Sequence, residues 1–261
     1  MALINDLNHD TVQGHMQRLL DLGRAKATAN RERVCLVALW RYAAQLKMVD
    51  TWPDVAKEKE PIRTPQAWMR EDVEAILAAT TRLTGDLHGT LIPAWLWWRT
   101  LIRLILDTGE RIGAVREARW EWLEKSSILV PAEFRKGGKA DKWFPLSVET
   151  IQLLGQIKNH TDDKKHIFPW HYCETYLWNR YRKLIEDAGL PTGRNCGYHR
   201  LRKTFASVSH AAGLNAQELL DHSSAKITAR YLDPRRTTQA STILAEWLRN
   251  PPAAKEDRKK A

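Results

Sequence analysis

Apolar residues recur every three or four positions along most of this 261-residue chain, and this spacing predicts a protein built mainly of helices. Near the N-terminus the pattern predicts one helix from a cap at Asp10 to about Leu22, before Gly23, and a second over about 30–48. Later in the chain we expect a helix opened by Arg70 and another that follows Pro93 and ends at Gly109. Further helices are predicted over about 148–157, 176–188, 199–212, 216–220 and 237–248.

Two short apolar segments have the composition of strands rather than helices. They cover 127–130 and 143–146, and they flank Arg135-Lys-Gly-Gly-Lys, a sequence typical of a hairpin turn. The fold class predicted is therefore mostly α with a small antiparallel β-sheet (α+β).

A proline-containing stretch divides the chain. Residues 51–66 carry Pro53, Pro61 and Pro65 among mixed charges, which indicates a linker rather than an element. We place the boundary at residue 62. The prediction is a short helical module with its linker over 1–62, a larger domain over 63–250, and a polar tail over 251–261 that we expect to be disordered.

Composition excludes several classes of protein. Hydrophobic residues make up 43% and charged residues 28%, and no uninterrupted apolar run reaches the length of a membrane span. The N-terminus lacks the basic start and apolar middle of a secretory signal. Three widely spaced cysteines, Cys35, Cys173 and Cys196, argue against a disulfide framework or a zinc ribbon. A reducing cytoplasm without a bound metal fits best.

Net charge is +10, which favours a polyanionic partner. Most of the excess lies after residue 60, although the stretch from Arg18 to Lys47 is also rich in basic residues and could present one face to phosphates. Charge alone does not separate DNA from RNA or from an acidic protein surface. A motif is needed to decide.

Candidate chemistry begins with Thr108-Gly-Glu-Arg-Ile-Gly. Gly109 would let the backbone turn, so that Arg111 starts the next helix at a fixed place. A guanidinium is planar, permanently charged and bidentate, as phosphate recognition requires. In the expected hairpin, Lys136 could protonate a departing oxygen, and Lys139 is the competing candidate. Taken singly, these residues are more often surface ion pairs or exposed lysines.

The remaining candidates lie between Gly197 and Tyr231. His199 and Arg202 are one helical turn apart and would project from the same side. His222 sits in Leu-Leu-Asp-His-Ser-Ser, at a break between short helices, and Tyr231 ends Thr-Ala-Arg-Tyr. Two imidazoles, a guanidinium and a phenol can together attack a phosphodiester without a metal.

As a set, these residues resemble the tyrosine recombinases, also called phage integrases. The likeness covers about 65–248, and about 11–50 looks like part of the helical core-binding (SAM-like) domain that precedes the catalytic domain in that family. All six active-site residue types occur in the family's order: Arg111, Lys136, His199, Arg202, His222 and Tyr231. We also expect basic neighbours of these residues to contact DNA, namely Arg135, Lys139, Arg200 and Lys203.

The resemblance implies a site-specific recombinase that cuts double-stranded DNA. Tyr231 would form a 3′-phosphotyrosine bond, with Lys136 as general acid and His199 assisting proton transfer. Arg111, Arg202 and His222 would bind the phosphate, and no cofactor or metal is implied. The family's assembly implies a homotetramer on DNA that exchanges a C-terminal helix, here 237–248, and a monomer without DNA. A mobile genetic element is the expected source.

Three departures from the family pattern favour one alternative function, and shared chemistry leaves a second one open. Ala114 stands where the family commonly has an acid, Asp221 replaces the usual glycine before His222, and an N-terminal part near 60 residues is shorter than a full core-binding domain. Asp221 could repel a phosphate or orient His222. The alternatives are a type IB topoisomerase, which relaxes DNA by the same chemistry, and a DNA-binding protein of this fold with lost or lowered cleavage activity.

Overall fold

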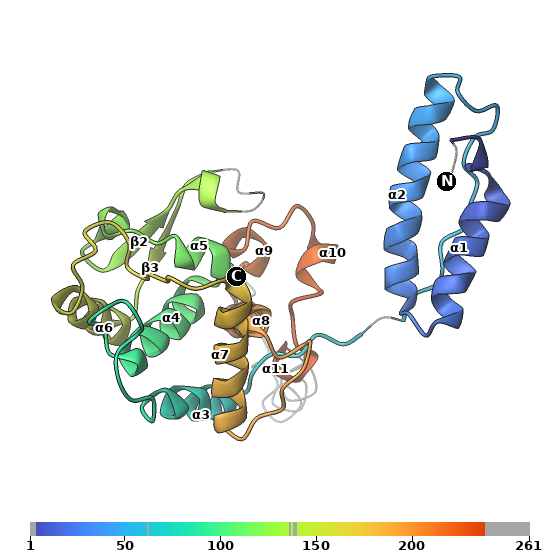
Figure 1. The fold of residues 1–261 in the computed structure, drawn as a ribbon. Helices are drawn as coiled ribbons and strands as arrows, with labels where there is room; N and C mark the ends of the chain where they lie inside the picture. The colour runs from blue at the N-terminus through green and yellow to red at the C-terminus, as the bar shows by residue number, and fades with distance from the viewer. Residues whose placement is uncertain (1–3, 62, 136, 138–139, 238–261) are drawn as a thin grey trace, which may run out of the picture. The chain divides into compact units, whose positions relative to one another are not determined.

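The computed structural model describes residues 4–61, 63–135, 137 and 140–237, and its ribbon is shown in Figure 1. The chain divides into two compact units, Met1–Arg63 and Thr64–Ala261. The helix expected over 237–248 and the tail over 251–261 lie outside the described residues, apart from residue 237.

Unit 1 is a pair of helices, α1 (His9–Asp21) and α2 (Lys26–Gln45), preceded by the short 3₁₀ helix η1 (Ile4–Asp6). The cap of α1 is Asn8 rather than the expected Asp10, because the Asn8 side chain accepts from the Thr11 amide at 3.0 Å. The helix that we expected over 30–48 begins and ends a few residues earlier. A small apolar core of Val12, Met16, Trp40 and Val55 joins the helices to the segment after them.

That following segment is not a free linker. Asn30 holds the backbone of Glu58 through two hydrogen bonds of 2.9 Å, and the Trp40 indole donates to the carbonyl of Thr51. The Arg33 guanidinium also binds the carbonyl of Val55, whose side chain is buried. Residues 51–60 therefore lack an element, as expected, but pack along α2 as part of unit 1.

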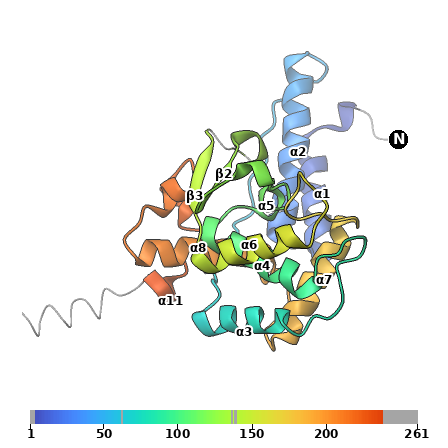
Figure 2. The same cartoon turned by 90° about the vertical axis from the view of Figure 1, so that its left-hand side faces the viewer.

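Unit 2 is built around α4 (Ala94–Thr108), an almost wholly buried helix. It contacts α3 (Arg70–Thr80), α5 (Ile112–Arg116), α6 (Val148–Asn159) and α8 (Tyr198–Ala211). Figure 2 shows α4 between α3 and the small sheet. Burying a large apolar side chain contributes roughly 1.5–3 kcal/mol, so the seven buried Leu, Ile and Trp residues of α4 make it the main support for the elements that carry the site.

The sheet has three antiparallel strands in the order β1 (Leu123–Glu124), β2 (Ser127–Val130) and β3 (Lys142–Pro145). Ser127 pairs with Pro145 and Val130 with Lys142. The structure confirms the α+β class and the antiparallel pairing of the two predicted strands, β2 and β3. The turn predicted at Arg135-Lys-Gly-Gly-Lys lies in the connection between them, where Lys136, Gly138 and Lys139 are outside the described residues. The connection is long and includes the 3₁₀ helix η3 (Ala132–Phe134).

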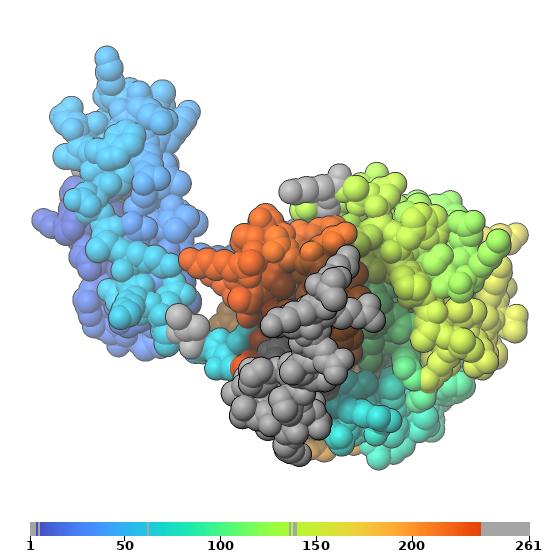
Figure 3. Space-filling model, turned by 180° about the vertical axis from the view of Figure 1, so that it is seen from behind, coloured from blue at the N-terminus to red at the C-terminus, as the bar shows by residue number. Residues whose placement is uncertain are grey.

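The remaining elements complete unit 2 in chain order. They are η2 (Trp120–Trp122), α7 (Glu174–Asp187), α9 (Ala216–Leu219), α10 (Ala225–Thr228) and α11 (Pro234–Thr237). Helices α9 and α10, orange in Figure 3, lie at the surface of the unit. Across the described ranges, no helix has both the length and the apolar character needed to cross a membrane.

Candidate active site

The turn between α4 and α5 sets the position of Arg111. Gly109 ends α4 in the left-handed region, at φ 64°, and a Cβ built there would lie 2.1 Å from the Phe205 ring of α8. Only glycine satisfies both the conformation and the packing. Arg111 then caps α5, as the sequence predicted, with its side chain half-buried.

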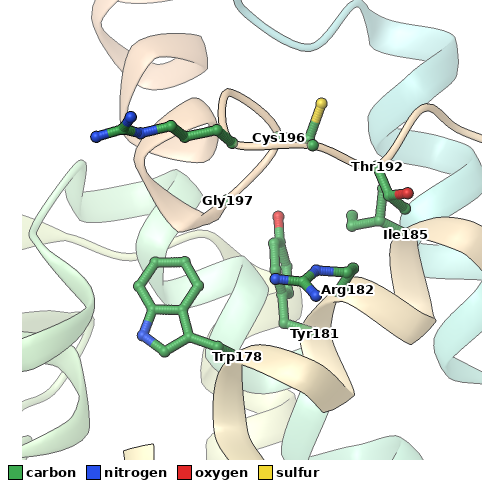
Figure 4. A pocket seen from close by; sticks show the side chains of 9 residues that line it. Trp178, Tyr181, Arg182, Ile185, Thr192, Cys196 and Gly197 are labelled. Carbon is green, nitrogen blue, oxygen red and sulfur yellow. The ribbon is translucent and has the colours of Figure 1, made fainter. Parts of the chain in front are cut away.

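Helix α8 brings His199 and Arg202 to the same place. It starts after Gly197, where a Cβ would lie 2.7 Å from the Trp178 ring. Figure 4 shows Gly197 and Trp178 beside a small pocket. Glycine therefore lets the start of α8 pack closely on α7. None of the residues that line this pocket is one of the six catalytic candidates.

Arg202 is fixed before any substrate arrives. Its side chain is 1% exposed, and its guanidinium donates to the carbonyl of Gly109 and, at 3.1 Å, to that of Leu220. These bonds tie α8 both to the α4–α5 turn and to the end of α9. Such a held guanidinium loses little conformational freedom when it binds an anion.

Tyr231 meets both candidate histidines. Its hydroxyl lies 2.8 Å from Nε2 of His199, and its ring centroid lies 4.5 Å from that of His222. The Arg202 guanidinium carbon is 5.7 Å from the centre of the same ring. One catalytic cluster is thus formed by four residues: His199, Arg202, His222 and Tyr231.

One ring nitrogen of His222 has no protein partner within the described part of the chain. Its Nδ1 lies 3.1 Å from the Thr228 hydroxyl, and its residue is 8% exposed. Among the described residues, no side chain or backbone group bonds its buried Nε2. A buried polar atom normally has a partner, so this nitrogen is a candidate contact for a substrate oxygen.

The electrostatics of the cluster are those of an anion site. Partial burial, and then the charges of Arg202, Lys203 and Arg111, lower the pKa of His199 to about 4. Desolvation and the charges of Arg202 and Arg111 lower the pKa of His222 to about 4 as well. Both imidazoles are therefore neutral at pH 7. The charge of Arg111 contributes to the lowered pKa of both rings.

The comparisons with known proteins agree with this arrangement. The profile described as the phage integrase family matches residues 68–237, which is more than half of the chain. The chain belongs to the phage integrase family. The matched residues include the α4–α5 turn, α8, the α9–α10 turn and Tyr231.

Individual relatives are distant. A putative tyrosine recombinase XerC from Pseudomonas aeruginosa is 26% identical over 89% of this chain, and the chain spans 60% of that relative's length. A lambda integrase dimer bound to a COC′ core site has a TM-score of 0.68 at 19% identity, covering 90% of this chain and 82% of that one. A lambda integrase tetramer bound to a Holliday junction has a TM-score of 0.69 at 18% identity, covering 90% and 67%. These structures establish the integrase fold.

Two basic residues expected to contact DNA are instead buried inside unit 2. Arg135 is 4% exposed and pairs with Glu110 and Asp221. The Arg200 guanidinium lies 3.6 Å from the centre of the Trp68 ring, and the residue is 7% exposed. Both predictions are wrong, because each side chain already has its partners within the fold.

Lys203 is half-buried, and burial lowers its pKa. Lys136 and Lys139 lie outside the described residues.

The two departures from the family pattern also have a structural outcome. Asp221 takes φ 52°, the left-handed conformation that favours glycine, and its carboxylate turns to Arg135 and Lys142. The His222 ring bonds to the Thr228 hydroxyl, whereas the Asp221 carboxylate is engaged by these two cations. Ala114 is buried and apolar, and the buried carboxylate beside Arg202 comes from Glu110, 3.7 Å away.

Sequence reasoning missed Glu110 and Thr228. Glu110 lies inside the quoted Thr-Gly-Glu-Arg motif, but nothing in its local pattern shows that it is buried. Thr228 opens the Thr-Ala-Arg-Tyr motif, and its contact with His222 depends on how α10 folds back on the α9–α10 turn. Within the described part of the chain, no group of three or more His, Cys, Asp or Glu side chains is arranged to hold a metal ion.

Proposed function

We propose that this integrase is a site-specific DNA recombinase that cuts and rejoins strands through a 3′-phosphotyrosine intermediate. The observation that carries the proposal is the 2.8 Å contact between the Tyr231 hydroxyl and Nε2 of His199, beside the buried Arg202. A neutral imidazole can accept the phenolic proton, and the low pKa of His199 keeps it neutral at pH 7. Family membership supports the same chemistry.

In the cleavage step, Tyr231 gives its proton to His199 and its oxygen attacks the scissile phosphorus. The bond from phosphorus to the 5′ oxygen breaks as the new bond to Tyr231 forms, and the 5′ oxygen takes a proton to leave as a hydroxyl. We assign Lys136 as the donor of that proton, on the family's pattern. One phosphodiester replaces another, so the reverse step can rejoin a strand without an added energy source.

Three groups would stabilise the charge that develops on the phosphate. Arg202 and Arg111 supply fixed positive charge, and the unpartnered Nε2 of His222 can donate to a non-bridging oxygen. That donation needs the proton on Nε2, which is favoured when the Thr228 hydroxyl donates to Nδ1 and not to the carbonyl of Ser224, 3.4 Å away. Bringing an anion to the site would raise the pKa of both histidines, because it partly offsets the arginine charges.

We further propose that double-stranded DNA is the substrate and that four copies assemble on it. The net charge of +10 supports an anionic partner, and the lambda integrase tetramer on a Holliday junction shares the fold. The helix expected over 237–248 would make the contact between neighbours. Three free cysteines are consistent with work in a reducing cytoplasm.

Trapping the covalent intermediate tests the cleavage chemistry. We would incubate the protein with a pool of nicked duplexes of randomised sequence, in which the released fragment diffuses away, and separate adducts on a denaturing gel. Wild type should give a protein–DNA adduct, Tyr231→Phe should give none while still binding DNA, and the control Tyr176→Phe should behave as wild type. An adduct that survives in Tyr231→Phe, or none in wild type, would overturn the proposal.

A second assay separates recombination from relaxation. DNA recovered from the trapped adducts supplies the site, which is then placed twice on one plasmid. A recombinase should give junctions and exchanged products from the two-site plasmid. Relaxation of supercoils without exchanged products would instead identify a type IB topoisomerase.

A further inference from the structure

A group of charged side chains, two of them buried, adjoins the catalytic candidate Arg202. The Glu110 and Arg135 side chains are 2% and 3% exposed, and Nε of Arg135 is 2.7 Å from Oε1 of Glu110. Arg135 also pairs with Asp221, whose other oxygen lies 3.2 Å from Nζ of Lys142. The second oxygen of Glu110 faces Arg202 at 3.7 Å. We call Glu110, Arg135 and Asp221 the charge cluster.

Each member of the charge cluster stands one position before a catalytic candidate. Glu110 precedes Arg111, Arg135 precedes Lys136, and Asp221 precedes His222. The three members come from separate segments: the α4–α5 turn, the chain after η3, and the turn between α9 and α10. The ion pairs therefore fix the mutual positions of three segments, each of which adjoins a catalytic candidate in the sequence.

Stability alone is a poor reason for this arrangement. Removing charges from water is costly, and well-packed apolar residues often stabilise a fold as well as a buried ion pair does. Ion pairs are directional, whereas apolar contacts are not, so each ion pair holds two side chains in one relative geometry. Arg202 shows the effect, because it is held by Glu110 and by the carbonyls of Gly109 and Leu220, which adjoin two cluster members.

We infer that the charge cluster is a positioning device, in which Glu110 orients Arg202 and, through Arg135 and Asp221, keeps the three catalytic segments in register. This inference rests on the proposed function, since it assigns the cluster a part in that cleavage reaction. Neither Glu110 nor Asp221 is expected to touch the DNA. Their effect should fall on the rate of strand cleavage and not on DNA affinity.

The test uses single-turnover cleavage of the nicked duplex selected by wild type. Glu110→Gln keeps the shape of the side chain and removes its charge, and it should lower the cleavage rate constant by about 10- to 100-fold, as losing an orienting partner does in other sites. DNA affinity, measured in the Tyr231→Phe background, should stay within about twofold of its unsubstituted value. The final yield of adduct should also remain that of wild type, because a misfolded fraction lowers the yield and not the rate constant.

Glu149→Gln is the matched control. Glu149 also pairs with two arginines, Arg99 and Arg103, but these join α4 to α6 away from the catalytic cluster. The Glu149→Gln substitution should leave the cleavage rate constant within about twofold of wild type. If Glu110→Gln does not fold, Asp221→Asn takes its place, because the Asp221 side chain is 27% exposed and tolerates loss of its charge better. We expect it to cleave at least about threefold more slowly than wild type.

The outcomes separate this inference from the proposed function. If wild type forms no adduct, the proposed function fails and the cluster has no reaction to serve. If wild type cleaves and Glu110→Gln cleaves at the same rate, or loses only yield, the cluster is structural and the inference is wrong. If Asp221→Asn is used in place of Glu110→Gln, cleavage at the wild-type rate in that variant would likewise show that the inference is wrong.

Discussion

His199 and Tyr231 make the direct contact from which the cleavage chemistry would start, and the cations around them set its pH range. Arg202, Lys203 and Arg111 all disfavour a positive charge on the ring, after burial has already done so. The same cations attract the phosphate. One group of charges thus keeps the base unprotonated and prepares the site for an anion.

This coupling predicts an unusual acid limit for cleavage. At DNA concentrations well below saturation, the rate reports the ionisation of the free protein. Since the pKa of His199 is about 4 rather than 6.5, cleavage should persist as pH falls through 6.5 and decline only as pH approaches 4. Initial adduct-forming rates between pH 4 and 8 would show this, and a decline centred near 6.5 would contradict it.

The same shift has a consequence for folding that serves as a control. Between pH 6.5 and 4 the unfolded chain binds more protons at His199 and His222 than the folded protein does. Stability from these two groups is therefore complete above pH 6.5 and is lost as pH falls towards 4. Thermal unfolding must be followed over the same range, so that loss of cleavage is not confused with loss of fold.

At the scale of elements, the α4–α5 turn depends on one glycine. Gly109→Ala would place a Cβ in the left-handed region and 2.1 Å from the Phe205 ring, so α8 would have to move. We expect a loss of about 1–3 kcal/mol of stability, measured by urea unfolding. Cleavage should fall as well, because Phe205 shares α8 with Arg202.

Gly155→Ala is the control for that substitution. Gly155 lies inside α6, and a Cβ there meets nothing within 4 Å. Alanine has the higher helix propensity, so this variant should gain roughly 0.5–1 kcal/mol. Equal shifts in the two variants would show that the conformation of Gly109 is not the cause.

The sequence predicted helices more reliably than it predicted charged partners. Helix α4 and its end at Gly109 follow from local apolar spacing and one glycine, so they could be found without the fold. The strands on either side of the β2–β3 connection were also predicted to within one residue, but η3 and the anchoring of Arg135 inside that connection were not. Burial of Glu110, Arg135 and Arg200 depends on partners far away in the chain, and local patterns carry no trace of them.

For the whole molecule, the remaining question is whether unit 1 binds DNA as a family core-binding domain would. Arg31 and Arg41 are exposed on α2, whereas Arg33 on the same helix is engaged with the carbonyl of Val55 at 2.7 Å. We propose that exposed arginines of this unit contact phosphates. Each contact releases counterions, so losing one should reduce the steepness with which affinity falls as salt rises.

Arg31→Gln and Arg41→Gln test this in the Tyr231→Phe background, where binding is measured without cleavage. Each should weaken DNA binding and reduce the slope of log affinity against log salt by about 0.9 per lost phosphate contact, measured by fluorescence anisotropy. Arg33→Gln is the matched control, because its structural bond predicts lower stability of unit 1 and an unchanged slope. If all three variants keep the parent slope, unit 1 does not hold DNA through these arginines. If Arg33→Gln changes the slope as much as the others, the effect comes from damage to α2 rather than from phosphate contact.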